Sequence, residues 1–280
     1  MISVLILTKN EEMDLPGCLA SVAWCDDIHV FDSFSTDATA RVAEQVGATV
    51  TRRTFDGYAS QRNAALRGLS FRYPWVLIVD ADERIPPALA SEMCRFVSDE
   101  TGFVAGRIRR RDYLSGCHLK HVQASPLYIR LVRPERVAYE REVNEVLRAD
   151  GLVKDLREPF DHHPFSKGLS HWVDKHNVYS SLEAKEVLRS RQGANPVSFR
   201  DAFFARDFNE RRFHQKELFY RLPARPLVKF LLLYVLKRGF LDGGAGFVYA
   251  TLQSIYEYMI VLKTAELERE KSAVSPSPPV

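Results

Sequence analysis

Four short runs rich in apolar or β-branched residues lie in the first 80 residues, and each is followed by a segment with helical periodicity; this alternation constrains the fold of the chain most. The runs are residues 2–7, 28–31, 49–52 and 75–79. Apolar, β-branched strands that alternate with helices predict a parallel sheet covered by helices on both faces. The fold class expected from this pattern is therefore α/β.

Local signals place the helices between these runs. Asn10, followed by two acids, is expected to cap the first helix, and residues 35–37 (Ser-Thr-Asp) the second. The third helix is expected over residues 61–69, and the fourth begins at Pro87, since proline is tolerated in a first turn. Four helices thus accompany four strands.

The fourth run ends in a cluster of acids, VLIVDADERIP. Alternate side chains of an extended segment share a face, so Asp80 and Asp82 are expected to point the same way. Two carboxylates this close repel each other unless a cation lies between them. Mg²⁺ or Mn²⁺ suits such a site, because hard divalent ions prefer carboxylate, water and phosphate oxygens. A lone pattern of this kind is also compatible with a solvated loop.

Polar residues follow the other strands too. Thr8, Asn10 and Glu11 follow the first, Asp32 follows the second, and Arg62 and Asn63 begin the third helix. In an open parallel sheet, ligands bind beyond the carboxyl ends of the strands. We therefore expect these residues and the acids after the fourth strand to meet at one edge of the sheet.

Four segments together, ILTKNEE, VFDSFSTDATARVA, FDGYASQRNAAL and VLIVDADERIP, resemble the nucleotide-sugar half of the family 2 glycosyltransferases, whose fold is called GT-A. The resemblance covers roughly residues 1–165. It implies a GT-A catalytic domain over 1–165, with a nucleotide-sugar half (1–100) and an acceptor half (101–165). A helical region (166–268) and a disordered tail (269–280) would follow.

The resemblance also implies roles for individual residues. Asp32 would bond the uracil or its ribose, Arg62 would approach the base or the diphosphate, and Asp80 would bond the ribose. Asp82 would be the main metal ligand and take part in catalysis. The expected donor-binding set is Thr8, Asn10, Glu11, Asp32, Arg62, Asn63 and Asp80.

An inverting transfer needs a carboxylate that takes the proton of the acceptor hydroxyl. The segment YEREVNEVL offers Glu140, Glu142 and Glu145. A narrower resemblance, to the branch that contains lipopolysaccharide-core β-glucosyltransferases, selects Glu145 as the base. Asn144 stands where that branch usually has histidine.

The same branch has a histidine after this point and then a helix with a Lys-x-x-x-Tyr-Ser pattern, as in KHNVYSSLEA. His162 fits that histidine and would complete the metal shell or orient the diphosphate, with His163 as its competitor. A run of basic residues (Arg107, Arg109, Arg110 and Arg111) would bind an anionic acceptor or form a solvated face.

The C-terminal third contains two apolar stretches, KFLLLYVLKR and GFVYATLQSIYEYMIVLK. Each falls short of the roughly 20 apolar residues that span a bilayer. Aromatic residues and flanking cations favour an amphipathic pair on the membrane surface. Packing against the domain, or against a second copy of it, is the alternative.

The expected activity is a metal-dependent inverting transfer from a UDP-sugar, with UDP-glucose as the first choice. The acceptor would be a lipid-linked or lipopolysaccharide-core saccharide. A net charge of +3 does not indicate nucleic acid, and MISVLILTKN does not resemble a secretory leader. We expect a cytoplasmic protein, peripheral on the inner face of the cytoplasmic membrane.

Two other classes of protein share parts of this pattern. A nucleotidyltransferase shares the architecture but usually shows a glycine-rich phosphate loop, and ILTKNEE has no glycine. A non-catalytic sugar-nucleotide-binding protein of the same fold would not need Asp80 and Asp82 intact. A dehydrogenase is disfavoured because no GxGxxG follows the first strand.

Overall fold

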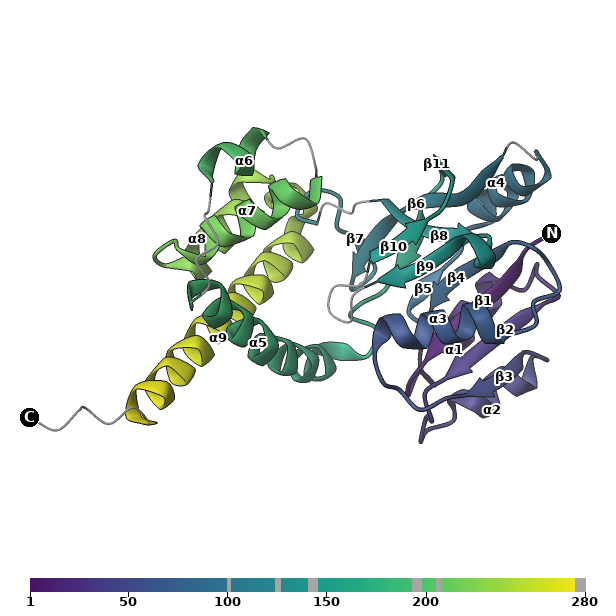
Figure 1. Cartoon of the computed structure of the whole chain (residues 1–280), viewed down its shortest axis with the longest axis horizontal. Coiled ribbons are helices and arrows are strands. Elements are labelled where there is room, and N and C mark those ends of the chain that lie inside the picture. Colours follow the sequence, from purple (N-terminus) through teal and green to yellow (C-terminus); the bar gives the residue numbers. More distant parts are fainter. Residues whose placement is uncertain (100–101, 124–126, 141–145, 193–197, 205–207, 275–280) are drawn as a thin grey trace, which may run out of the picture. The chain divides into compact units, whose positions relative to one another are not determined.

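A computed structural model describes residues 1–99, 102–123, 127–140, 146–192, 198–204 and 208–274. The chain divides into two compact units. The first consists of the described residues of 1–118 and 124–167. The second consists of Leu119–Gln123 and the described residues from Gly168 onward. Figure 1 shows the elements of both units along the chain.

The first unit is built on a mixed sheet whose strands run in the order β3-β2-β1-β4-β8-β6-β12-β5 (Figure 1). Strands β3, β2, β1 and β4 are parallel, and β8 is antiparallel to both β4 and β6. The strands are β1 (Ser3–Thr8), β2 (Ile28–Asp32), β3 (Thr49–Arg52), β4 (Val76–Asp80), β5 (Glu83–Arg84), β6 (Phe103–Leu114), β7 (Cys117–His118), β8 (Leu127–Val132), β9 (Val137–Glu140), β10 (Val146–Ala149), β11 (Leu152–Asp155) and β12 (Phe160–His162).

Helices cover both faces of this sheet, as the uninterrupted apolar strands require. One face packs against α1 (Leu15–Ser21), α2 (Thr39–Gln45) and α4 (Pro87–Ser98). The other face packs against α3 (Tyr58–Gly68) and the β9–β10 hairpin. The mainly parallel, helix-flanked sheet with a helical C-terminal part confirms the predicted fold class.

The predicted start of the first helix is wrong. Asn10 has a left-handed backbone (φ 56°), and α1 begins only at Leu15. The Asn10 side-chain oxygen accepts hydrogen bonds from Thr36 instead of capping its own helix. This partner lies 26 residues away, so local sequence rules could not identify it.

The second unit is helical in its described part. Its helices are α5 (Gly168–Gln192), α6 (Phe199–Phe204), α7 (Phe208–Tyr220), α8 (Arg225–Leu231) and α9 (Gly243–Val274). Val187, Tyr220 and Ile260 form a core where α5, α7 and α9 meet. A buried ion pair joins Arg225 of α8 to Glu257 of α9, with Nε and Oε1 2.7 Å apart. Helix α9 continues beyond residue 268, where we expect the tail to begin, because Glu, Lys and Arg are good helix formers.

Candidate functional site

A hydrogen bond between two side chains joins the carboxyl ends of β1 and β2. Thr8 Oγ1 donates to Asp32 Oδ1 at 2.9 Å, and both residues are buried. Ser35 adds two further bonds to the same carboxylate, from its backbone N–H (2.8 Å) and from its hydroxyl (2.5 Å). Asp32 has no exposed surface and holds these two loops together; its predicted hydrogen bond to the uracil or ribose stays a prediction.

The loop after β1 is fixed to the loop after β2 by several more bonds. Lys9 Nζ donates to the carbonyl oxygens of Ser33 and Phe34, each at 2.7 Å. The backbone N–H of Asn10 donates to Ser35 Oγ at 2.8 Å. Because these contacts hold two neighbouring strand ends, they give that edge of the sheet a rigid frame.

Glu11 stands out in this frame. Its Oε1 pairs with Lys167 Nζ at 2.8 Å, while its Oε2 is buried with no hydrogen-bond partner among the described residues. Burial raises the pKa of Glu11 to about 7, although Lys167 opposes the shift and the nearby charge of Asp82 reinforces it. An unsatisfied buried oxygen carries a desolvation penalty that a hydrogen-bonding ligand would relieve.

Asp80, at the end of β4, lies between two arginines. Arg62 Nη2 of α3 is 3.0 Å from Oδ1, and Arg130 Nη2 of β8 is 3.0 Å from Oδ2. Burial alone would raise the pKa of Asp80, but Arg62 and Arg130 hold it well below its usual value. The cation expected between Asp80 and Asp82 is therefore not needed to balance Asp80, because two guanidinium groups already do so.

Arg130 also binds the third acid of the cluster. Its Nη2 is 2.6 Å from Glu83 Oε1, and Glu83 Oε2 accepts the backbone N–H of Asp80 at 2.9 Å. Both side chains are almost completely buried, whereas 32% of the Asp80 side chain is exposed. Burial raises the pKa of Glu83 to about 7, and Arg130 opposes this shift. Glu83 and Arg130 thus form a buried support beneath a partly exposed Asp80.

Asp82 faces a histidine. Its Oδ2 is 3.3 Å from His162 Nε2, and His162 Nδ1 is 2.6 Å from Asp112 Oδ1. Burial acts to lower the pKa of His162, but hydrogen bonds to Asp112 and Asp82 raise it to about 9. The imidazole is thus oriented by a buried carboxylate on one side and turned toward a partly exposed carboxylate on the other.

Asp82 and His162 could hold a divalent cation if the ion displaces the Nε2 proton of His162, since a ligating histidine must be deprotonated at that nitrogen. Histidines that bind metals usually donate their second ring N–H to a carboxylate, as His162 can to Asp112. Among the described residues, no group of three or more His, Cys, Asp or Glu side chains could enclose a metal. A bound ion would thus take two protein ligands and complete its shell with water and phosphate oxygens, as Mg²⁺ commonly does.

Other predicted residues make contacts away from the acids of β4. Asn63 donates to the Tyr139 carbonyl oxygen (2.8 Å) and accepts from the Tyr139 N–H (2.9 Å), so it joins α3 to β9; its predicted place in the donor-binding set stays a prediction. Glu140 pairs with Arg148 on the β9–β10 hairpin. Glu142, Asn144 and Glu145 lie outside the described residues.

Three of the four arginines in the basic run pair with acids. Arg107 pairs with Asp155, Arg110 with Asp112, and Arg111 with Asp161. These pairs cross between β6 and its neighbours β11 and β12, or lie along β6 itself. The run therefore holds strands together and orients Asp112. Since three of its guanidinium groups are paired with carboxylates, less positive charge is left to bind an anionic acceptor.

Sequence reasoning missed three members of the site. Arg130, Asp112 and Lys167 contact the predicted residues Asp80, His162 and Glu11, respectively. Arg130 lies in the mostly apolar strand β8, and Asp112 lies in β6 directly after three arginines. Neither residue belongs to a recognisable sequence motif. A charged residue within an otherwise buried strand was the one signal available, because such residues are rarely buried unless paired.

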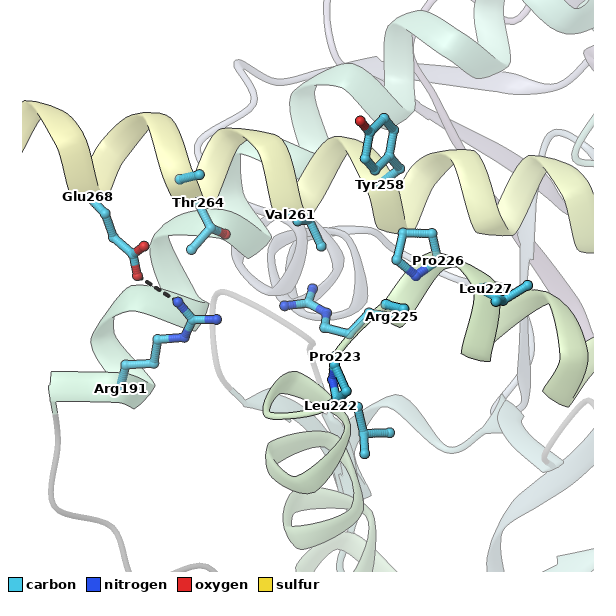
Figure 2. A pocket seen from close by; sticks show the side chains of 12 residues that line it. Arg191, Leu222, Pro223, Arg225, Pro226, Leu227, Tyr258, Val261, Thr264 and Glu268 are labelled. Atoms are coloured by element: carbon cyan, nitrogen blue, oxygen red, sulfur yellow. Dashed lines mark hydrogen bonds and ion pairs between the residues drawn. The ribbon is translucent and has the colours of Figure 1, made fainter.

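The helical unit contains a pocket of its own. It encloses about 580 Å³ between the end of α5, the Leu222–Leu227 segment and α9. Figure 2 shows Tyr258, Val261 and Thr264 of α9 along one side, and the ion pair between Arg191 and Glu268. None of the site residues described above lines it.

Taken together, the fold and the site define an α/β enzyme with acids, a histidine and cations at the carboxyl edge of a mainly parallel sheet. Residues 3–140 match the family model described as glycosyl transferase family 2. The chain therefore carries a family 2 glycosyl transferase domain and is a glycosyltransferase.

Relatives extend the similarity along the chain. The chain is 27% identical over 270 residues to the lipopolysaccharide core biosynthesis glycosyltransferase LpsC of Rhizobium meliloti, covering 94% of this chain and 91% of that protein. It is also 27% identical over 281 residues to the glycosyltransferase RT0209 of Rickettsia typhi, covering 95% of this chain and 87% of the relative.

Two solved structures are similar to a lower degree. TarS of S. aureus (residues 1–349) aligns with a TM-score of 0.44 at 15% identity, over 92% of this chain and 90% of that one. Glucosyl-3-phosphoglycerate synthase of Mycobacterium tuberculosis, in complex with Mn²⁺, UDP and its product, aligns with a TM-score of 0.35 at 23% identity. That alignment covers 40% of this chain and 44% of the other.

Proposed function

We propose that this glycosyltransferase moves a sugar from a UDP-sugar, with UDP-glucose as the first choice, to a lipid-linked or lipopolysaccharide-core saccharide. The reaction would be metal-dependent and would invert the anomeric centre. The observation that carries the proposal is the Asp82–His162–Asp112 chain beside the Arg62–Asp80–Arg130 cluster at the end of β4. The similarity to LpsC favours the lipopolysaccharide core as the source of the acceptor.

In this proposal each group has a distinct task. Asp82 and His162 would hold the divalent ion, which neutralises charge on the departing diphosphate when bound. Asp80, partly exposed between its arginines, would accept hydrogen bonds from the ribose, since an ionised carboxylate only accepts. Thr8, Asn10 and Asp32 would keep the base-side loops in place, and the unpartnered oxygen of Glu11 would bond the nucleoside.

The first test is donor hydrolysis, which needs no acceptor. A panel of UDP-sugars is incubated with the protein and Mn²⁺, and UDP release is measured. We expect slow, Mn²⁺-dependent hydrolysis of one UDP-sugar, with UDP-glucose first. If neither UDP-sugar hydrolysis nor UDP binding is seen with or without Mn²⁺, the proposed function is wrong.

Glu145→Gln is expected to retain UDP binding and to lose most transfer. A general base contributes roughly 10²- to 10⁴-fold, and glutamine keeps the shape of the side chain but cannot take a proton. Transfer kinetics and UDP affinity are measured on the same preparation. Glu142→Gln is the matched control; a large loss in that variant, with near-normal turnover in Glu145→Gln, would move the base to Glu142.

We further propose that the helical unit binds the surface of the cytoplasmic membrane. Around the junction of α8 and α9, many large apolar side chains are at least about half exposed. They are Leu227, Leu231, Val235, Leu236, Phe240, Leu241, Phe247 and Val248. Lys237 and Arg238 stand between them in the chain, so apolar surface and positive charge occur together, as anionic lipid headgroups require.

No helix within the described ranges has the length and apolarity to cross a bilayer. Surface binding is the way of covering this apolar region that we propose, and burial against a second copy of the chain is the alternative. Burial of the region on lipid is favourable by about 0.8 kcal/mol per CH₂ group.

Leu236→Glu combined with Leu241→Glu is expected to reduce flotation with phosphatidylglycerol vesicles by roughly tenfold or more. Two apolar contacts are lost, and two negative charges face an anionic surface. Val178→Glu on α5, also exposed in the wild type, is the control and should float normally. Unchanged flotation of the double variant, or a dimer that dissociates in it, would contradict membrane binding.

A further inference from the structure

A second pocket lies in the catalytic unit and is not used by any step above. It encloses about 290 Å³ and is lined by Arg84, Tyr113, Ser115, His163, Phe165 and Ser166. This volume corresponds to roughly ten water molecules, which is room for one monosaccharide unit but not for a longer glycan. We call it the Tyr113–His163 pocket.

The pocket wall has aromatic and hydroxyl groups side by side. The Tyr113 ring and the His163 imidazole are stacked, with centroids 5.2 Å apart and planes inclined by 20°. Ser115 lies in a two-residue turn between β6 and β7, and both it and Gly116 have positive φ, as such tight hairpins require. The His118 imidazole also lies 5.5 Å from the Tyr113 ring, so this ring is held between two imidazoles. Aromatic side chains supply apolar contact surface in a ligand pocket, and a few placed hydroxyls fix the orientation of the ligand.

Arg84 supplies the one guanidinium of the wall. Its Nη1 donates to the carbonyl oxygens of Ala81 (2.9 Å) and Glu83 (2.8 Å), which fixes the group. The guanidinium also lies over Gly17, where a Cβ would be only 2.6 Å from Nε and Nη2. Gly17 thus leaves the space that Arg84 needs, and Arg84 can present a donor to a sugar oxygen.

The pocket adjoins the proposed reaction centre through the backbone. Strands β12 and β5 are antiparallel, with His162 opposite Glu83, and the next N–H, of His163, donates to the Asp82 carbonyl oxygen at 2.9 Å. His163 therefore lies opposite Asp82. The pocket and the proposed donor site share this strand pair.

The segment after His163 is hydrogen-bonded to residues that follow the first strand. Ser166 Oγ donates to Asp14 at 2.8 Å, and Lys167 Nζ donates to the Asn10 carbonyl oxygen at 2.8 Å. One wall of the pocket is thus tied both to the Asp82 strand and to the loop proposed to hold the nucleoside. A saccharide in this pocket would approach the donor from the side of Asp82.

We infer that the Tyr113–His163 pocket binds a monosaccharide unit of the saccharide acceptor. This inference rests on the proposed function, because it takes the sugar donor to lie at Asp82. It assigns acceptor recognition to Tyr113, His163 and Arg84, which makes them specificity-determining residues for the transfer.

The test is saturation-transfer NMR on the full chain with UDP, Mg²⁺ and a fixed set of methyl glycosides: heptoside, glucoside, galactoside and 3-deoxyoctulosonate. At least one glycoside is expected to bind the wild type, with roughly fivefold lower affinity for Tyr113→Ala, since the aromatic contact is then lost. Tyr113→Phe keeps the ring and should bind normally. Tyr73→Ala, which alters another half-buried tyrosine, is the control.

Signals from UDP in the same spectra separate the two proposals. Normal UDP signals without any glycoside signal in the wild type would overturn the inference and leave the proposed function intact. Glycoside binding that survives Tyr113→Ala would also overturn it. If the wild type gave no UDP signal, the proposed function itself would be wrong.

Discussion

Asp82→Asn is expected to lower both transfer and Mn²⁺-dependent UDP-sugar hydrolysis on the order of 10³-fold. A metal ion stabilises the charge of the transition state by several kcal/mol, and each 1.36 kcal/mol corresponds to tenfold in rate. The amide of asparagine removes the anionic ligand while keeping the size of the side chain. Mn²⁺ binding, followed by electron paramagnetic resonance, should weaken in parallel.

A graded variant distinguishes a ligand from its support. Asp112→Asn leaves Asp82 and His162 in place but removes the carboxylate that orients the imidazole, at 2.6 Å. A loss of roughly 10- to 100-fold in metal affinity is expected for such a partner. Asp26 is an exposed acid paired with Arg72, so Asp26→Asn is the control and should change neither the metal affinity nor the rate of transfer. Equal metal affinity in Asp82→Asn and the wild type would remove Asp82 from the metal site.

Arg130→Met is expected to destabilise the protein by about 3–5 kcal/mol, since removing one partner of a buried ion pair leaves an uncompensated charge. Arg130 is the main counter-ion of Glu83, whose side chain is 2% exposed, and it shares Asp80 with Arg62. Methionine fills similar space without charge. The free energy of unfolding is measured by urea denaturation.

Two further variants identify the cause. Arg130→Met combined with Glu83→Gln should recover part of the lost stability, because the buried charge is then absent from both sides. Arg72→Met removes an exposed pair with Asp26 and should cost no more than about 1 kcal/mol. A loss in Arg130→Met as small as that in Arg72→Met would mean that Glu83 does not depend on Arg130.

Much of the sheet follows from short-range sequence signals. The first four strands appear where the apolar runs predict them, with the third at Thr49–Arg52 as expected and the fourth displaced by one residue to Val76–Asp80. Strands β1, β2 and β4 are buried on both faces, so their composition alone marks them, whereas β3 at the edge of the sheet is partly exposed. Because parallel strands end at one edge, the order of polar residues after each strand also predicts that they converge.

The partners of those residues were not predictable in the same way. Local rules predict that Asn10 caps a helix, but its side chain accepts a hydrogen bond from Thr36 in the neighbouring loop. They say nothing of the hydrogen bonds that join Asn63 to the backbone of Tyr139, 76 residues away. In both cases the asparagine side chain can form several hydrogen bonds, and it bonds the group that the fold brings nearest. Helix and capping propensities carry no information about a group so far away in the sequence.

By itself, the sequence determined the α/β architecture, the acids at the end of the fourth strand and the family to which the domain is similar. These depend on periodicity and on residues close together in the chain. Only the tertiary structure decided that Asp80 is balanced by Arg62 and Arg130, and that Asp82 faces a histidine held by Asp112. The physical reason is that charge compensation acts through space, over a few ångströms between side chains 18 to 80 positions apart.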